Sequence, residues 1–400
     1  MFGSALSPAV RKGAVAALAA ASLVMSAACA SEAGSGSPGE REGDASPPSA
    51  SASAPSSSGT PSDLPPAKGS VKVVSTLTEG LASPWGLAAL PGGDLLVASR
   101  DDATITLIDG ESGKKTLLGS VPGVAPGGEG GLLGLAVSST FGADRLVYAY
   151  FTTESDNRIA RMLYEERKPA GQQLGAPDTI LRGIPKGSIH NGGRIAFGPD
   201  RMLYAGTGET GDTGLAQDKE SLGGKILRMT PDGEPVHGNP EADSVVYSYG
   251  HRNVQGLAWD GQKRLWAAEF GQNTWDELNR IEPGGNYGWP EVEGEQGEKG
   301  FIDPVAQWKT EDASPSGIAF ADGSIWMAGL RGERLWRIPL SGTSDKDPLA
   351  APQSFLDGEH GRLRTVLAAG EDRLWLVTSN TDGRGTPKPG DDRIVLLEVR

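Results

Sequence analysis

The sequence predicts an all-β protein, a six-bladed β-propeller preceded by a signal peptide and a disordered linker. Two observations predict the propeller. A short apolar strand, a turn containing Asp, Gly or Pro, and a second apolar strand recur six times through the last ~330 of the 400 residues. Gly and Pro are plentiful, with 58 and 28 residues, while helical periodicity is scarce, which is typical of short strands joined by tight turns.

The six copies start roughly 48 to 62 residues apart, the length of a four-stranded blade with its loops. One such sheet cannot bury both of its faces, but six sheets packed radially can, and their loops then converge on a central axis. A β-sandwich is the main structural alternative, although sandwiches seldom show long internal repeats. The copies open at Gly86-Leu87-Ala88, Gly134-Leu135-Ala136, Arg194-Ile195-Ala196, Gly256-Leu257-Ala258, Gly317-Ile318-Ala319 and Thr365-Val366-Leu367.

Two further strands are expected at the ends of the repeat array. Residues 71–77 read as a first strand, and residues 393–399 alternate well enough to form a last one. The last strand can close the ring by pairing into the first or the last blade.

The first 29 residues have the form of an export signal. Arg11 and Lys12 supply its positive charge, and the apolar run at 14–25 is too short to span a bilayer. Small residues then lead to Cys29, the only cysteine, as in a bacterial lipobox where the thiol takes lipid. Ser26 stands where such sites usually carry a large aliphatic residue, and ordinary cleavage nearby is the alternative. We expect 1–29 to be a lipoprotein-type signal peptide that leaves the chain anchored through Cys29 at the extracytoplasmic face of the membrane.

Composition divides the rest of the chain into two parts. Residues 30–68 are rich in Ser, Pro and Gly with almost nothing apolar, which predicts a disordered tether. Residues 69–400 form the predicted propeller, which is large enough to be stable through its core alone. The net charge of −14 argues against nucleic-acid binding, which needs a basic face.

Three polar stretches interrupt the repeats, each at the entrance to or exit from a repeat strand. Residues 188–194 and 206–212 carry His190 and Glu209, so a carboxylate could fix the tautomer of an imidazole that takes a proton near neutral pH. The other two stretches contribute arginines, whose guanidinium groups stay charged and suit a flat ligand with several carboxylates. If the entrances share one face, one cavity is ringed by His190, Arg252, Arg331, Arg362 and Arg364.

Each of these residues also has a purely structural explanation. His190 could be a turn residue beside Asn-Gly-Gly, and His251 could be a buried hydrogen-bonding group between blades. Arg362 and Arg364 could be solvated side chains on one face of a strand, while Arg331 could pair with Glu333. The functional interpretation depends on the motifs recurring together.

Several longer segments carry a resemblance to a known family. They are SPWGLAALPGGDLLVASR, GGEGGLLGLAV, HNGGRIAFGPDRMLYAGTGETGD, LGGKILRMTPDGEPVHGNP, YGHRNVQGLAW, AEFGQNTWDELNRI, GGNYGWP and the GRLR near the end. In this order they resemble the soluble quinoprotein sugar dehydrogenases of the glucose/sorbosone dehydrogenase family, and within it the aldose sugar dehydrogenases. The resemblance covers roughly residues 81–400 and implies a six-bladed propeller, which agrees with the repeat count.

The resemblance also implies a cofactor and a reaction. The family holds pyrroloquinoline quinone (PQQ), a planar tricarboxylate, beside Ca²⁺ near the axis. His190 matches the base that removes the C1 hydroxyl proton of an aldose while hydride passes to the quinone, which gives a lactone. Glu209 matches the carboxylate that supports this histidine. Arg252 and Asn253 match residues over the quinone oxygens, so Arg252 is also a catalytic candidate, and Gln255 matches a further cofactor contact.

The remaining implied contacts concern the cofactor carboxylates and calcium. Arg362 and Arg364 match the pair that grips the carboxylates, and Arg331 falls where the family usually has Lys. Backbone carbonyls of the turn at Gly271 and Gln272 match the ligands of the cofactor's calcium ion, with Asp276 behind the turn as a further support. Glu277 and Tyr287 match part of a second, structural calcium site.

Three functions therefore compete. The first is a lipid-anchored PQQ- and calcium-dependent sugar dehydrogenase, which passes electrons to a separate acceptor because the sequence has no haem-attachment CxxCH motif. The second is a non-catalytic propeller lipoprotein that binds a carbohydrate or a protein. The third is a hydrolase of the lactonase-like propellers, which use carboxylate-rich calcium sites, whereas the axial motifs here are rich in Arg.

Overall fold

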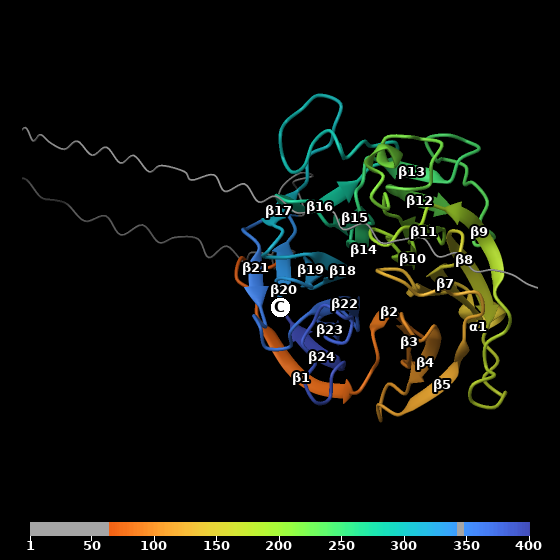
Figure 1. Cartoon of the computed structure of the whole chain (residues 1–400). Coiled ribbons are helices and arrows are strands. Elements are labelled where there is room, and N and C mark those ends of the chain that lie inside the picture. The colour runs from red at the N-terminus through yellow and green to blue at the C-terminus, as the bar shows by residue number, and fades with distance from the viewer. Residues whose placement is uncertain (1–63, 342–347) are drawn as a thin grey trace, which may run out of the picture. The chain divides into compact units, whose positions relative to one another are not determined.

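The computed structural model describes residues 64–341 and 348–400. The predicted signal peptide with Cys29, and all but the last residues of the predicted tether, lie outside this range. The described residues form six four-stranded antiparallel sheets that surround a central axis (Figure 1). The predicted six-bladed propeller is therefore confirmed. No helix in the described part of the chain is long and apolar enough to cross a membrane.

The first three blades follow one another in chain order, and each runs from its innermost strand outward. Blade 1 comprises β2 (Pro84–Ala89), β3 (Leu95–Ser99), β4 (Thr104–Ile108) and β5 (Lys115–Ser120). Blade 2 comprises β6 (Leu132–Val137), β7 (Leu146–Thr152), β8 (Asn157–Leu163) and β9 (Asp178–Ile184), with the short helix α1 (Phe141–Asp144). Blade 3 comprises β10 (Ile195–Phe197), β11 (Leu203–Gly206), β12 (Lys225–Met229) and β13 (Val246–Tyr249), with a 3₁₀ turn, η1 (Thr213–Ala216).

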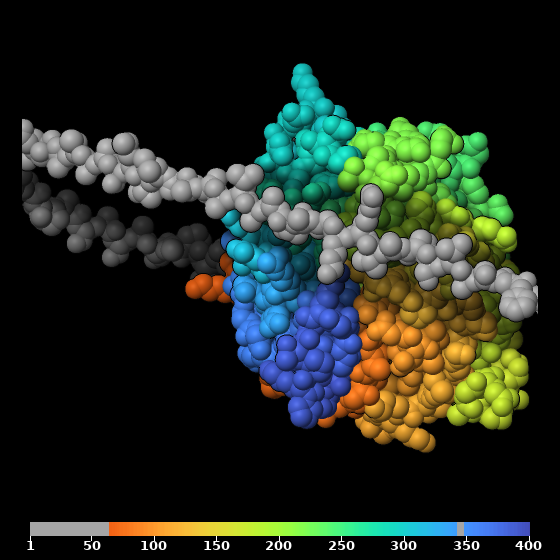
Figure 2. Space-filling view, in the orientation of Figure 1, coloured from red at the N-terminus to blue at the C-terminus, as the bar shows by residue number. Residues whose placement is uncertain are grey.

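The last three blades continue the same pattern. Blade 4 comprises β14 (Val254–Trp259), β15 (Leu265–Glu269), β16 (Trp275–Ile281) and β17 (Ala306–Lys309). Blade 5 comprises β18 (Pro315–Ala321), β19 (Ser324–Gly329), β20 (Leu335–Pro339) and β21 (Gln353–Phe355). Blade 6 comprises β22 (Leu363–Ala368), β23 (Arg373–Thr378), β24 (Ile394–Val399) and β1 (Val71–Thr78). The segment between β16 and β17 projects from the surface (Figure 2).

The six sequence repeats open the six innermost strands. Each innermost strand contacts the innermost strand of the next blade, in the order β2, β6, β10, β14, β18, β22 and back to β2. Glycine permits this approach at most of the repeat openings, since a Cβ on Gly134 would lie 2.1 Å from the carbonyl oxygen of Gly193 in the next blade.

The ring closes through strands from opposite ends of the chain. β1 pairs antiparallel with β24 as the outermost strand of blade 6, with Val71 opposite Val399 and Thr76 opposite Val395. Both predicted end strands are confirmed, and the pairing places the last strand in the last blade. Contacts with the propeller begin before residue 69, because the Pro66 carbonyl accepts a hydrogen bond from Arg337 Nη2 at 2.8 Å.

The apolar core is divided into six clusters, and each cluster fills the space between two neighbouring blades. Between blades 1 and 2, for example, Leu96 and Ile105 pack with Leu132 and Val147, all of them buried. Period-2 alternation alone would bury one face of each strand, but here both faces of a blade contact a neighbour. The apolar core therefore lies between neighbouring blades, around the axis.

Antiparallel pairing decides which loops meet at one end of the axis. The start of each innermost strand lies opposite the end of the second strand, as in the pairs Pro84–Ser99, Val254–Glu269 and Leu363–Thr378. Residues just before an innermost strand and just after a second strand therefore share one face of the propeller. We call this the upper face.

Substitution at a blade contact tests the packing of the innermost strands. Gly134→Ala forces a methyl group against the next blade, so we expect a loss of about 1–3 kcal/mol in the free energy of unfolding measured in urea. Gly142→Ala is the matched control, because no atom lies within 4 Å of its added Cβ. Equal stability of the two variants would contradict close packing between blades 2 and 3.

Candidate active site

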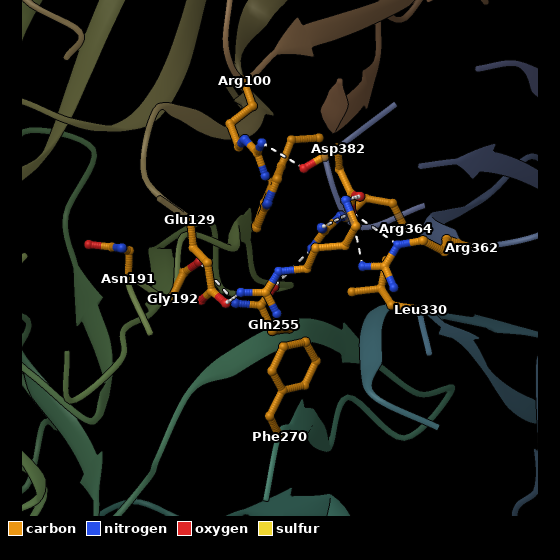
Figure 3. Close-up of a pocket in the computed structure, with 12 residues that line it drawn as sticks. Arg100, Glu129, Asn191, Gly192, Gln255, Phe270, Leu330, Arg362, Arg364 and Asp382 are labelled. Atoms are coloured by element: carbon orange, nitrogen blue, oxygen red, sulfur yellow. Dashed lines mark hydrogen bonds and ion pairs between the residues drawn. The ribbon is translucent and has the colours of Figure 1, made fainter. Parts of the chain in front are cut away.

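A hollow of about 420 Å³ opens among the upper-face loops, and all six blades contribute to its wall. Figure 3 shows Arg100 of blade 1, Glu129 at the start of blade 2, and Arg362 and Arg364 of blade 6 converging on it. Its lining residues are Trp85, Arg100, Glu129, Asn191, Gly192, Gln255, Phe270, Leu330, Arg362, Arg364, Asp382 and Arg384.

His190 and Glu209 form the predicted pair. Nδ1 of His190 lies 2.6 Å from Oε1 of Glu209, and the Glu209 side chain is only 1% exposed. The His190 side chain is 12% exposed, and its Nε2 makes no hydrogen bond with any described residue. Since the carboxylate holds Nδ1, Nε2 is the nitrogen that can accept a proton from a bound molecule.

The backbone around His190 is fixed as well. His190 has φ of +52°, and its N–H donates to Oε2 of Glu129 at 2.9 Å. Its carbonyl accepts from the N–H of Thr210 at 3.2 Å, which ties it to the loop that carries Glu209. The other oxygen of Glu129 pairs with Arg384 at 2.6 Å. A positive φ is costly for a residue with a side chain, so these contacts must hold the imidazole in place.

Arg252 lies between this pair and blade 4. Its carbonyl accepts the Glu209 N–H at 2.9 Å, and its Nη1 donates to the Phe270 carbonyl at 3.3 Å. Its guanidinium carbon lies 5.4 Å from the ring centre of Trp289. Burial lowers the pKa of Arg252, although the nearby Glu209 carboxylate opposes the shift. Arg252 is thus a partly buried cation beside the histidine pair.

Asn253 and Gln255 tie the start of β14 to blade 3. Oδ1 of Asn253 accepts the Gly192 N–H at 3.0 Å, and Nε2 of Gln255 donates to the Gly192 carbonyl at 3.1 Å. Oε1 of Gln255 accepts from Nη1 of Arg364 at 3.3 Å. Gln255 therefore connects the segment that follows His190 with the arginines of blade 6.

Arg362 and Arg364 share one carboxylate. Oδ2 of Asp382 lies 2.9 Å from Nη2 of Arg362 and 3.4 Å from Nη2 of Arg364. Burial alone would raise the pKa of Asp382, but Arg364 and Arg362 outweigh it and hold the pKa below its ordinary value. Arg100 also donates to the Asp382 carbonyl at 3.1 Å. Asp382 thus compensates part of the charge of a wall on which positive charge exceeds negative charge.

Three buried donors at the site have no acceptor among the described residues. They are Nε of Arg252, Nδ2 of Asn253 and Nε of Arg364. Leaving such a group unpaired costs about 1–3 kcal/mol, so buried donors nearly always find a partner. All three are N–H groups, which indicates a ligand rich in oxygen acceptors.

The turn at Gly271 and Gln272 has an ordered main chain. Oε1 of Glu293 accepts four successive N–H groups, from Gln272, Asn273, Thr274 and Trp275, at 2.7–3.1 Å. Burial would raise the pKa of Glu293, but these bonds hold it below its ordinary value. Asp276 accepts the Gly271 N–H at 3.0 Å, which gives it the predicted place behind the turn. Because the N–H groups face these carboxylates, the turn's carbonyl oxygens remain available to a cation.

Glu277 and Tyr287 lie in a buried polar cluster. Glu277 accepts from Asn279 and from the Gly294 N–H, and burial together with the Glu269 carboxylate raises its pKa to about 8. The Tyr287 hydroxyl donates to the Arg280 carbonyl at 2.6 Å and accepts the Glu282 N–H at 2.8 Å, so it is already satisfied. No three His, Cys, Asp or Glu residues in the described ranges are grouped to hold a metal ion. Calcium here would depend largely on carbonyl oxygens.

Of the predicted ring, Arg362 and Arg364 line the hollow, whereas His190, Arg252 and Arg331 are not among its lining residues. His251 lies outside the hollow as well. His251 is fully buried, contacts Ser248 and Glu269 at 2.8 Å and stacks on Tyr287, as the structural alternative predicted. Arg331 is exposed and makes no ion pair with Glu333 or with any other described residue, while its neighbour Leu330 lines the hollow. A cofactor-binding role for Arg331 stays a prediction.

Several lining residues were not singled out from the sequence. Arg100 and Asp382 come just after second strands, and Glu129 comes just before an innermost strand. These positions are equivalent in the repeat to those of Glu209 and His190. Aligning the repeats on their strands would have found them, whereas Trp85 and Arg384 carry no comparable signal.

Comparison with known proteins gives one family. The sequence model described as glucose/sorbosone dehydrogenase matches residues 81–388. The fold resembles a PQQ-bound aldose sugar dehydrogenase from Streptomyces coelicolor, with 73% identity, a TM-score of 0.83 and coverage of 84% of this chain and 100% of that chain. Quinoprotein glucose dehydrogenase B of Acinetobacter calcoaceticus is 30% identical over 300 residues, which are 66% of this chain and 63% of that protein. Aldose sugar dehydrogenase YliI of Escherichia coli is 27% identical over 341 residues, which are 78% and 91%.

Removal of the shared carboxylate tests the charge balance of the wall. Asp382→Asn leaves Arg362 and Arg364 buried without a counter-ion, so we expect a loss of about 3 kcal/mol in unfolding free energy at pH 7. Because the folded-state pKa lies below 3.8, the contribution is complete above about pH 4 and is lost as pH falls through the folded value. The difference in unfolding free energy between Asp382→Asn and wild type should therefore become smaller at acidic pH.

The matched control for this experiment is Asp178→Asn. Asp178 pairs with Arg161 at 3.0 Å, but its side chain is 64% exposed, so the loss should stay below about 1 kcal/mol. The assigned pairing would be contradicted if Asp382→Asn lost no more unfolding free energy than Asp178→Asn, or if its loss did not depend on pH.

Proposed function

Because the chain belongs to the glucose/sorbosone dehydrogenase family, we propose that it oxidises the C1 hydroxyl of an aldose to the lactone with PQQ as hydride acceptor. The observation that carries this proposal is the His190–Glu209 pair, in which Nε2 is unbonded and the His190 N–H is held by Glu129, a residue that lines the arginine-rich hollow. A base, donors for oxygen atoms and positive charge are what this oxidation needs.

The described residues fit PQQ. The molecule is planar and carries three carboxylates and two quinone oxygens, so it offers acceptors to unpaired N–H groups of Arg252, Asn253 and Arg364. Arg362 and Arg364, which line the hollow, would hold the carboxylates of PQQ, and Gln255 accepts a hydrogen bond from Arg364. The similar Streptomyces coelicolor structure is described as PQQ-bound, which supports the same ligand here.

We further propose that Ca²⁺ binds with the cofactor at the carbonyls of Gly271 and Gln272. The four bonds to Glu293 and the bond to Asp276 hold this turn without using its carbonyl oxygens. Oxygen ligands of this kind suit calcium. A second calcium ion beside Glu277 would reduce the repulsion between the buried Glu277 and Glu269 carboxylates.

The chain's own residues then perform the acid–base part of the reaction. When bound, PQQ supplies the two-electron acceptor for the hydride that leaves C1. Nε2 of His190 takes the C1 hydroxyl proton, and Glu209 holds the imidazole by Nδ1 and stabilises its cationic form. Arg252 interacts electrostatically with Glu209. Its positive charge would stabilise oxygen atoms of the bound molecules that gain negative charge while C1 is oxidised. A separate carrier must finally take the electrons.

We propose that the protein is exported and held at the extracytoplasmic face of the membrane through lipid on Cys29. The signal-like residues 1–29 and the small residues before Cys29 support this location. A single lipid-modified terminus followed by residues 30–68 would let the propeller reach substrate and electron acceptor away from the bilayer.

Titration of the propeller with PQQ and calcium tests the proposed function directly. The ring closes between β1 and β24, so residues 64–400 can be used alone. Calcium-dependent binding, followed by spectral reduction of the cofactor on addition of an aldose, is the expected result. Sugar binding without reduction would favour the binding propeller, and lactone hydrolysis without PQQ would favour the hydrolase.

Two variants should separate catalysis from cofactor binding. His190→Asn removes the base, so kcat should fall at least 10²-fold while PQQ affinity is kept. Arg364→Ala removes a buried charged donor, so PQQ affinity should fall about 10- to 100-fold. Arg145→Gln, at a side chain that is 46% exposed, is the control and should change neither. Equal losses of binding and turnover in both variants would contradict this division of roles.

Cys29→Ser tests the anchor in the full chain. Without the thiol no lipid can be attached, so the protein should move from the membrane fraction to the soluble extracytoplasmic fraction with unchanged turnover. Metabolic labelling with a radioactive fatty acid should mark wild type alone. Retention of the variant at the membrane would overturn the proposed anchor.

A further inference from the structure

Arg194 breaks the repeat at the axis of the propeller. The equivalent position is Gly in four other blades and Thr in blade 6. The Arg194 side chain crosses the axis: its Nε donates to the Gln255 carbonyl of blade 4 at 2.8 Å, and its Nη2 donates to Oγ1 of Thr365 in blade 6 at 3.2 Å. Its guanidinium carbon also lies 4.4 Å from the ring centre of Trp85 in blade 1.

This side chain separates two cavities. Trp85 and Gln255, which it touches, line the hollow of the upper face. On the other side lies an axial channel lined by the innermost strands of all six blades. The channel includes the ends of these strands, at Ala89, Val137 and Leu367, so it opens toward the face opposite the hollow. Among the residues that the structure describes, Arg194 is the only charged one in its wall.

The charge of Arg194 is not balanced by the described residues around it. The side chain makes no ion pair with any described carboxylate, its two bonded acceptors are neutral, and the residue is only 8% exposed. Burial and the neighbouring Arg364 cation lower its pKa to about 9, which leaves it charged at neutral pH. Nη1 has no acceptor within the described ranges. A buried cation without a counter-ion is costly, which favours an anion as its partner.

The remaining channel wall is apolar. Apart from Arg194, Thr365 and Gly317, it presents aliphatic and aromatic side chains. A sugar would leave its hydroxyl groups unpaired against this surface, whereas a hydrocarbon group would not. The main contributors are Leu87, Leu135, Phe197, Leu257, Ile318 and Leu367.

We propose that the axial channel is a second ligand site, which takes an amphipathic monocarboxylate. The carboxylate pairs with Arg194 at the closed end, and the hydrocarbon part lies along the apolar wall. One guanidinium with one unused nitrogen suits a single anionic group. The site is independent of the proposed redox function, because none of its ligand contacts requires PQQ, calcium or His190.

Calorimetric titration of residues 64–400 with octanoate at pH 7, without PQQ or calcium, tests this site. We expect saturable binding of one octanoate, with octanol and acetate each at least about ten-fold weaker because each lacks one half of the recognition. Arg194→Gln should weaken octanoate binding by about ten-fold or more, and Arg194→Lys should restore part of it. Arg145→Gln removes an exposed charge and should leave binding unchanged.

A second variant keeps the test decisive if Arg194→Gln fails to fold. Ala89 is exposed in the channel wall, so Ala89→Phe narrows the opening without touching Arg194 and should abolish octanoate binding. The proposal would be overturned if octanol bound as tightly as octanoate. It would also be overturned if octanoate still bound to both Arg194→Gln and Ala89→Phe. The absence of saturable octanoate binding to the wild-type propeller would overturn it as well.

Discussion

The pairing of β1 with β24 is the interaction on which the rest of the structure depends. Each blade buries its faces only against its two neighbours, so an open ring would expose two apolar sheet faces. Closure joins Val71 to Val399 across the whole length of the domain. It also fixes the distance between blade 6 and blade 1, and therefore the position of Arg362 and Arg364 relative to Arg100 and Trp85. The site exists only in the closed ring.

The closed ring also explains the electrostatics of the hollow. Several blades deliver polar residues just before the innermost strand, at its start, or after the second strand, so groups of both charges meet on one face. Asp382 and Glu129 compensate part of the arginine charge and position the groups they touch. The hollow still has more cationic groups and unpaired N–H donors than acceptors. Since the protein as a whole has a net charge of −14, these groups are not explained by a need for solubility. The surplus is specific to this hollow.

The sequence pattern predicted those features that depend on residues close together in the chain. The repeats located all six innermost strands because glycine and short apolar runs are needed wherever strands approach the axis. His190 and Glu209 were paired correctly because a single hairpin connects them. The contacts of Glu129 with Arg384 and of Arg100 with Asp382 span most of the chain, so only closure brings them together. Leu330 lines the hollow while its neighbour Arg331 is exposed, and the sequence could not predict this because both residues lie beyond β19, where strand alternation no longer applies.

Arg194 follows from the same geometry that requires glycine elsewhere. At Gly86, Gly134 and Gly256 an added Cβ would lie within 2.4 Å of a carbonyl oxygen of the next blade, so no side chain can leave the strand there. Arg194 instead bonds to the corresponding carbonyl, that of Gln255, and sends its guanidinium across the axis. Gln255 in turn accepts from Arg364, so a cation in the channel end and a cation in the upper hollow are held by one residue. Only a few buried groups separate Arg194 from Arg364, so solvent screens their charges little. A change of charge in the channel should therefore alter the electrostatic potential in the upper hollow, and the reverse.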